Sequence, residues 1–123
     1  MQHLSVVIAQ KDRVSAERLS LEFKRHFRNV LLAHSHVEIH DAITKLSAHA
    51  VIVDLELINL DELRRLCQNS LGAAVIATHR SPDDEMWMQC LAIGAADCCQ
   101  VDDVDGLLRA IAHNVHFAHA RAA

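Results

Sequence analysis

Asp54 is the residue of this sequence that most directly suggests chemistry. It follows four apolar residues, 50–53 (AVIV), and a short β-branched run of this kind is typical of a strand buried on both faces. An unpaired carboxylate is costly inside such a sheet. Asp54 is therefore expected either at the mouth of a strand, where ligands bind in open α/β sheets, or as the cap of a turn.

Polar residues also follow the other apolar runs of the chain. If these runs are parallel strands, their carboxyl ends meet at one edge of a sheet, and that edge is the expected place for a site. The polar residues at these ends are Gln10, Lys11 and Asp12, then Thr78 and His79, and finally Asp102.

The elements that would position these residues follow from the hydrophobic pattern. Strands are predicted at residues 5–9, 30–33, 50–53, 73–77 and 97–101, the last being the least apolar and so closest to an edge. Helices are predicted at residues 14–27, 37–48 and 60–70, then from Ser81 to a stop at Gly94, and from residue 104 to the high 110s. This alternation indicates right-handed βαβ units. The predicted fold is a doubly wound, five-stranded parallel sheet in a three-layer α/β/α sandwich.

The helices carry apolar stripes at spacings of three or four, which are expected to face the sheet. The expected inward residues are Ala16, Leu19, Phe23 and Phe27; Ile39, Ala42, Ile43 and Leu46; Leu60, Leu63, Leu66 and Cys67; Met86, Cys90 and Ile93, with Trp87 and Leu91 beside them; and Leu107, Leu108, Ile111 and Val115.

Length and composition exclude several classes of protein. A chain of 123 residues suits one domain, 1–123, and its 51% apolar and 23% charged residues exclude disorder. The net charge of −4 and the lack of a Lys/Arg cluster indicate no direct nucleic-acid binding. The longest N-terminal apolar run, residues 6–9, is too short for a membrane span or a signal peptide, so a cytoplasmic location is expected. No glycine-rich phosphate loop is present.

The cysteines and histidines carry weaker signals. Four cysteines show no C-x-x-C spacing, and Cys98 and Cys99 should point to opposite faces of a strand, which indicates reduced thiols. The ten histidines include two groups, His34, His36 and His40 and then His113, His116 and His119. Exposed, solvated imidazoles are favoured over a metal site for both groups.

With these elements in order, an Asp closing the third strand and a Thr closing the fourth, the chain resembles the receiver domain of two-component response regulators over about residues 4–116. Residues 54–63 (DLELINLDEL) match the family's phosphoacceptor loop, D-L-x-M-P-G-M-D-G-L, and residues 92–97 (AIGAAD) match A-x-G-A-x-D. Ile58 replaces the Pro and Glu62 the second Gly. Asn59 replaces the first Gly, and Asn tolerates a positive φ.

The resemblance implies a role for each matching position. Asp54 holds the phosphoacceptor position and Thr78 the hydroxyl that contacts the phosphoryl group. The family's Mg²⁺-binding acidic pair falls on Gln10 and Lys11. Its lysine at the end of the fifth strand falls on Val101, and its switch aromatic falls on Cys98. Asp12 supplies a carboxylate only if the alignment shifts by one residue.

These replacements argue against ordinary Mg²⁺-dependent phosphotransfer. Mg²⁺ requires oxygen ligands, and a lysine ammonium repels it, so no cofactor is expected. The ammonium of Lys11 is instead predicted to pair with Asp54, because the mouths of the first and third strands are adjacent in this fold. Asp54 would then be a structural or conformational residue.

The favoured function is a non-enzymatic, receiver-like signalling domain that works through protein contacts. The expected partners are an output domain, a cognate kinase or a second copy, bound through the face of the fourth helix, fifth strand and fifth helix, which includes Met86, Trp87, Cys98, Leu108 and Phe117. The alternative is an orthodox phosphorelay receiver phosphorylated on Asp54 by a histidine kinase. A remote alternative is an aspartyl-phosphate hydrolase, since Asp54 and Glu56 are similar to the D-x-D of haloacid dehalogenase-like phosphatases.

Overall fold

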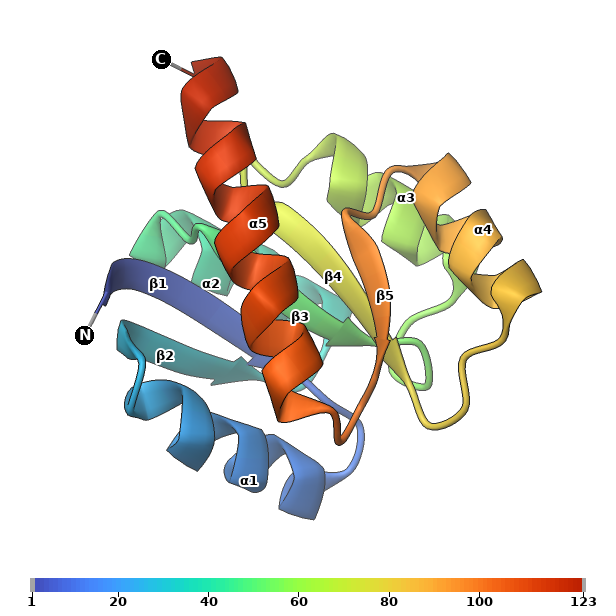
Figure 1. The fold of residues 1–123 in the computed structure, drawn as a ribbon, viewed down its shortest axis with the longest axis horizontal. Helices are drawn as coiled ribbons and strands as arrows, with labels where there is room; N and C mark the ends of the chain where they lie inside the picture. The colour runs from blue at the N-terminus through green and yellow to red at the C-terminus, as the bar shows by residue number, and fades with distance from the viewer. Residues whose placement is uncertain (1, 123) are drawn as a thin grey trace.

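The computed structural model describes the backbone of residues 2–122 and the side chains of residues 3–115. Five strands alternate with five helices (Figure 1). The elements in chain order are β1 (Gln2–Ala9), α1 (Arg13–Lys24), β2 (Phe27–Ala33), α2 (His36–Leu46), β3 (Ala50–Asp54), α3 (Leu60–Gln68), β4 (Ala74–His79), α4 (Asp84–Ile93), β5 (Asp97–Gln100) and α5 (Val104–Ala122).

All five strands pair in parallel in the order β2-β1-β3-β4-β5. β3 is the central strand, and all five of its residues are buried, as the β-branched run predicts. β5 lies at one edge of the sheet, in agreement with its weaker hydrophobic pattern. Because β1, β3 and β4 are parallel neighbours, their carboxyl ends lie side by side, and the strand order reverses direction between β1 and β3.

Two hydrophobic clusters lie on opposite faces of the sheet. Helices α1 and α5 cover one face, and Figure 1 shows α5 crossing in front of the strands. Helices α2, α3 and α4 cover the other face. Because successive strand residues alternate between faces, Val7 and Val51 enter one cluster while Val6 and Ile52 enter the other. This arrangement confirms the predicted three-layer α/β/α fold.

The end of the first helix was predicted incorrectly. The stripe of α1 was extended to Phe27, but α1 ends at Lys24 and Phe27 is the first residue of β2, paired with Gln2. Phe27 is nonetheless buried, with its ring edge against Phe23 at a centroid distance of 5.6 Å. Residue 27 could place its ring in this core from either a helix or a strand. Its backbone pairing with the long strand β1 favours the strand over the helix.

The fourth helix begins later and buries less than expected. Asp83, rather than Ser81, is its N-cap, because the Asp83 carboxylate accepts a hydrogen bond from the backbone N–H of Met86 at 2.8 Å. Cys90 is fully buried, whereas Met86 and Ile93 are only half-buried at the margin of the core. The helix ends at Gly94, as predicted, and Gly94 has φ +125°.

The loop after β3 also differs from the expectation. Asn59 has φ −86°, not a positive value, and it is the N-cap of α3. Its side chain accepts from the backbone N–H of Glu62, and the Glu62 carboxylate accepts from the backbone N–H of Asn59. Asn59 and Glu62 thus form a capping box. Within the described residues, no helix is both long and apolar enough to cross a membrane.

Candidate functional site

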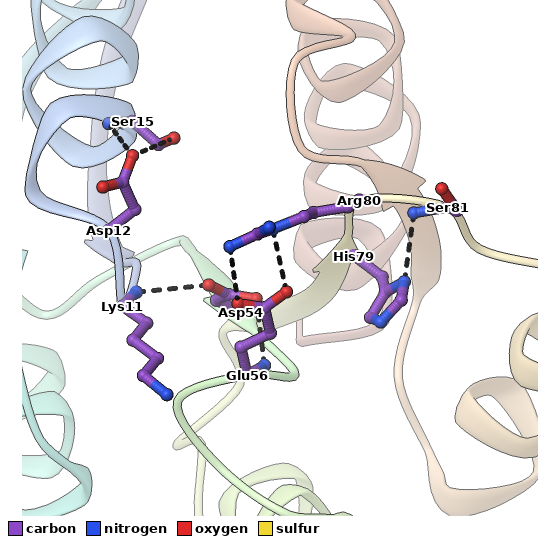
Figure 2. A network of polar contacts seen from close by, with 8 residues as sticks. All are labelled: Lys11, Asp12, Ser15, Asp54, Glu56, His79, Arg80 and Ser81. Carbon is purple, nitrogen blue, oxygen red and sulfur yellow. Dashed lines mark hydrogen bonds and ion pairs between the residues drawn. The ribbon is translucent and has the colours of Figure 1, made fainter.

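Asp54 is the last residue of β3 and is only 6% exposed. Its Oδ2 accepts a hydrogen bond from the backbone N–H of Lys11 at 3.2 Å, and its Oδ1 accepts one from the backbone N–H of Glu56 at 3.0 Å (Figure 2). The carboxylate therefore holds the loop after β1 to the loop after β3. Both bonds come from backbone amides, which satisfy the charge without a cationic side chain.

The predicted ion pair between Lys11 and Asp54 does not form. Figure 2 shows the Lys11 side chain directed away from Asp54, and among the described residues its ammonium has no ion pair. The adjacency of the two strand mouths was predicted correctly, but the contact comes from the backbone of Lys11. Side chains alternate at a strand end, so turning Gln10 inward leaves Lys11 facing solvent.

Gln10 is buried at the end of β1, with 1% of its surface exposed. Its Nε2 donates to Thr78 Oγ1 at 3.0 Å. Thr78 is fully buried in β4, and its hydroxyl also donates to the carbonyl of Val53 at 3.5 Å. Since β3 lies between β1 and β4, the Gln10 side chain links the two strands across the end of β3. Gln10 Oε1 is buried without a hydrogen-bond partner.

Asp12 lies outside this cluster. It is the N-cap of α1, and its Oδ2 accepts from both the hydroxyl of Ser15, at 2.8 Å, and the backbone N–H of Ser15, at 3.0 Å. These hydrogen bonds lower the pKa of the Asp12 carboxyl below its ordinary value, with a smaller contribution from the charge of Arg80. The carboxylate that a shifted alignment would supply is thus engaged by its own helix.

A cation that the sequence did not single out lies at the mouth of the site. Arg80 pairs with Glu56 through Nε–Oε1 at 3.0 Å and through Nη2–Oε2 at 3.3 Å, and Figure 2 shows its guanidinium extending toward the residues around Asp54. The Arg80 side chain is 73% exposed and that of Glu56 30%. The sequence spacing could have indicated this pair, because Arg80 follows Thr78 by two positions and Glu56 follows Asp54 by two positions.

The fifth strand contributes no cation to the site. Val101 is half-buried in the turn after β5, and its backbone N–H donates to the carbonyl of His79 at 3.0 Å. Cys98 is buried in β5 with 8% of its surface exposed. Burial, followed by the neighbouring Cys90, raises the pKa of its thiol to about 12. Position 98 therefore holds a small neutral group rather than an aromatic ring, and position 101 an apolar side chain.

Comparison with known proteins identifies solved structures that share this fold. No protein-family model matches the chain, and no curated protein matches it in sequence. Solved structures do. The receiver domain of a Francisella response regulator is 17% identical with a TM-score of 0.77, covering 98% of this chain and 100% of that one.

Two further structures agree over the same length of this chain. The receiver domain of a modulated diguanylate cyclase from Desulfovibrio desulfuricans is 18% identical, with a TM-score of 0.78 and coverage of 98% and 99%. A Burkholderia pseudomallei response regulator, solved with a phosphorylated aspartic acid, a calcium ion and citrate, is 21% identical. Its TM-score is 0.77, and coverage is 98% of this chain and 73% of that one.

These likenesses show that the chain has the fold of response-regulator receiver domains. At identities of 17% to 21% they establish the architecture and not the activity. Within that architecture, the carboxylate of Asp54 and the hydroxyl of Thr78 occupy neighbouring register positions, since Asp54 pairs with Thr78 along β3 and β4.

Proposed function

We propose that this chain is a receiver-like signal-transduction domain of a two-component or related regulatory system, in which Mg²⁺-dependent phosphorylation of Asp54 is impaired or absent. In this proposal the domain is not an enzyme, works in the cytoplasm and acts through contacts with other proteins. The observation that carries the proposal is the buried hydrogen bond from Gln10 to Thr78.

This hydrogen bond is half of a buried network in which the Thr78 hydroxyl accepts from Gln10 and donates to the Val53 carbonyl. A phosphoryl group adds about −1.5 to −2 charges and three strong acceptor oxygens, and it is stabilised by donors aimed at those oxygens. The Thr78 hydroxyl is already bonded to Gln10 and Val53, and it is fully buried. The hydroxyl has one proton to donate, so donating it to a phosphoryl oxygen would break the bond to Val53 and leave that buried carbonyl without its hydroxyl partner.

The donor set does not fit Mg²⁺. The metal prefers several carboxylate, carbonyl and water oxygens in an octahedral arrangement. Asp54 offers one carboxylate, whose two oxygens accept backbone hydrogen bonds, and Asp12 is bonded to Ser15. The positions of the family's acidic pair hold an amide, Gln10, and an ammonium-bearing residue, Lys11. The Arg80 guanidinium carries a positive charge at the mouth of the site, but it is paired with Glu56.

Intact-mass measurement after incubation with Mg²⁺ and a small phosphodonor such as acetyl phosphate tests the proposal. The wild-type domain is expected to gain no phosphoryl adduct. A matched control restores the missing groups through Gln10→Asp, Lys11→Asp and Val101→Lys, and it is expected to gain one adduct that is lost when Asp54→Asn is added. An adduct on the wild type that Asp54→Asn removes would instead support the orthodox phosphorelay receiver.

The proposed contact surface is the face of α4, β5 and α5. Trp87 is 44% exposed and Met88 64% exposed on α4, and the Trp87 indole donates from Nε1 to Asp97 Oδ1 at 3.1 Å, which orients the ring. Cys98, predicted for this face, is buried and therefore does not belong to it, while Leu108 is half-buried. Phe117 lies outside the described side chains.

Sedimentation velocity over a range of concentrations tests whether a second copy binds this face. Self-association that is lost in Trp87→Ala, but retained after substitution of the exposed Leu21 on α1, supports a homodimer through α4. A monomer at all concentrations leaves an output domain or a kinase as the partner to be sought.

A further inference from the structure

His36 and His40 form a close pair on one side of α2. Their Nε2 atoms lie 3.2 Å apart, and their rings meet edge to face with centroids 4.6 Å apart. Both residues are half-buried, in contrast to His34, which is exposed as the sequence predicted. The expectation of separate, solvated imidazoles is therefore wrong for His36 and His40.

The spacing of the two residues explains the contact. Residues four apart lie one above the other on a helix face. Ser35 caps the helix by accepting from the backbone N–H of Glu38 at 3.2 Å, and Ile39 is fully buried beneath it. The first turn, which carries His36, and the second turn, which carries His40, are thus held in a fixed relation.

The separation of the two nitrogens matches the bite of a metal chelate. Zinc–imidazole bonds are about 2.0–2.1 Å long. Two such bonds at a tetrahedral angle place the nitrogens about 3.3 Å apart, and at a right angle about 2.9 Å apart. The observed 3.2 Å lies between these values. The same i, i+4 spacing of histidines on a helix binds zinc in H-E-x-x-H sites.

We propose that His36 and His40 form a two-imidazole site for a divalent transition metal, with Zn²⁺ as its simplest occupant, bound through both Nε2 atoms. In the free protein one Nε2–H donates to the other Nε2. On binding, that ring moves its proton from Nε2 to Nδ1, so both Nε2 lone pairs face the metal and no net proton is released.

The rest of the coordination sphere sets the strength of the site. Among the described residues, no third His, Cys, Asp or Glu completes a cluster. Water therefore occupies the remaining positions. His36 Nδ1 is buried without a hydrogen-bond partner, and the outer hydrogen bonds that strengthen histidine ligands, each worth about 10–100-fold in affinity, are lacking for this ring. Binding is accordingly expected in the micromolar range, which suits an exchangeable ion.

Zinc titration of an untagged, metal-stripped domain tests the site. The background carries His113→Gln, His116→Gln and His119→Gln, which removes competing imidazoles. In that background one Zn²⁺ is expected to bind, and His36→Gln or His40→Gln is each expected to weaken binding at least tenfold. His34→Gln, which removes an exposed imidazole two residues from His36, is the matched control and is expected to leave the affinity unchanged.

A second measurement does not depend on the stability of the variants. Long-range ¹H–¹⁵N spectra of the histidine rings report which nitrogen carries the proton. Saturating Zn²⁺ is expected to place both rings, His36 and His40, in the Nδ1–H form with shifted Nε2 resonances. The proposal is overturned if neither ring responds to Zn²⁺, or if His34→Gln weakens binding as much as His36→Gln does.

Discussion

The amide of Gln10 is bonded at one end and unpartnered at the other, at the place where the family carries an acid. Its Nε2 bonds to Thr78, while its Oε1 is buried and unsatisfied. A buried polar atom without a partner costs about 1–3 kcal/mol. The amide links β1 to β4 across the end of β3, next to the register pair of Asp54 and Thr78.

We predict that Thr78→Val, which keeps the shape and removes the hydroxyl, lowers the free energy of unfolding by about 1–3 kcal/mol, because Gln10 Nε2 then loses its partner in a buried place. In a Gln10→Met background the same substitution is expected to cost clearly less, since no amide remains to be orphaned. Urea unfolding at 25 °C of the wild type, both single variants and the double variant measures the coupling. Equal costs in the two backgrounds would show that the hydrogen bond contributes nothing.

The two adjacent cysteines behave as the sequence predicted. Cys98 packs into the cluster under α2, α3 and α4, and Cys99 packs against the cluster under α1 and α5. The four cysteines are free thiols. Burial, together with neighbouring acidic groups at Cys99, raises the pKa of both thiols to about 12, and burial raises the pKa of Cys67 to about 11.

These thiols are therefore predicted to stay protonated and unreactive at neutral pH, because the thiolate is the nucleophile. Alkylation by iodoacetamide at pH 7.5, followed by mass spectrometry, is expected to label the folded domain slowly. The same chain unfolded in urea provides the control and should be labelled quickly at all four cysteines. Rapid labelling of Cys98 or Cys99 in the folded domain would contradict the prediction.

At the scale of elements, the loop after β3 is built differently from the glycine-containing loop that it resembles. Asn59 and Glu62 close a capping box, and Ile58 and Leu63, the residues on either side of the first turn, are both buried in the same core cluster. This combination is a capping box with a hydrophobic staple. The residues that replace the family's Pro and glycines thus serve to begin α3 and to hold the loop that follows Asp54.

Asn59→Ala is predicted to destabilise the domain by about 1 kcal/mol, since a helix N–H loses its capping oxygen. Asn59→Asp is the conservative control and is expected to retain most of the stability, because its carboxylate caps equally well and favours the positive end of the helix dipole. Thermal unfolding followed by circular dichroism compares the three proteins. If Asn59→Asp unfolds as early as Asn59→Ala, the cap is not the cause.

At the scale of the whole molecule, the sheet order brings three strand ends together and separates the proposed contact face from them. Asp54, Gln10 and Thr78 lie at the ends of β3, β1 and β4, whereas Trp87 is on α4 beside the edge strand β5. In a phosphorylation switch, charge added at the strand ends alters the contact face. In this domain the side chains at the strand ends are already hydrogen-bonded to groups within the domain.

The domain is therefore predicted to be insensitive to a phosphoryl analogue. Beryllium fluoride with Mg²⁺, which mimics an aspartyl phosphate, is expected to leave the backbone amide spectrum of the wild type unchanged, because the Thr78 hydroxyl is engaged and the metal lacks its ligands. The variant with Gln10→Asp, Lys11→Asp and Val101→Lys is expected to respond. Shifts in the wild type that reach from Asp54 to α4 would overturn the prediction.

By itself, the sequence determined the layered α/β/α architecture and the place of Asp54 and Thr78 at neighbouring strand ends. Apolar runs and helical stripes are local properties that any compact chain must bury, so they can be read without the structure. The exact limits of the helices and strands could not be read from the sequence, because Phe27 can be buried in the same core from a helix or from a strand. Its pairing with Gln2 decided for the strand.

The tertiary structure alone decided which atoms meet at the site. Gln10 and Thr78 are 68 positions apart, and their bond depends on the strand order and on the face that Gln10 presents. Lys11 reaches Asp54 through its backbone because one step along a strand reverses the side chain. The pairing of Arg80 with Glu56 and of His36 with His40 depends in the same way on direction in space, which residue types along the chain do not specify.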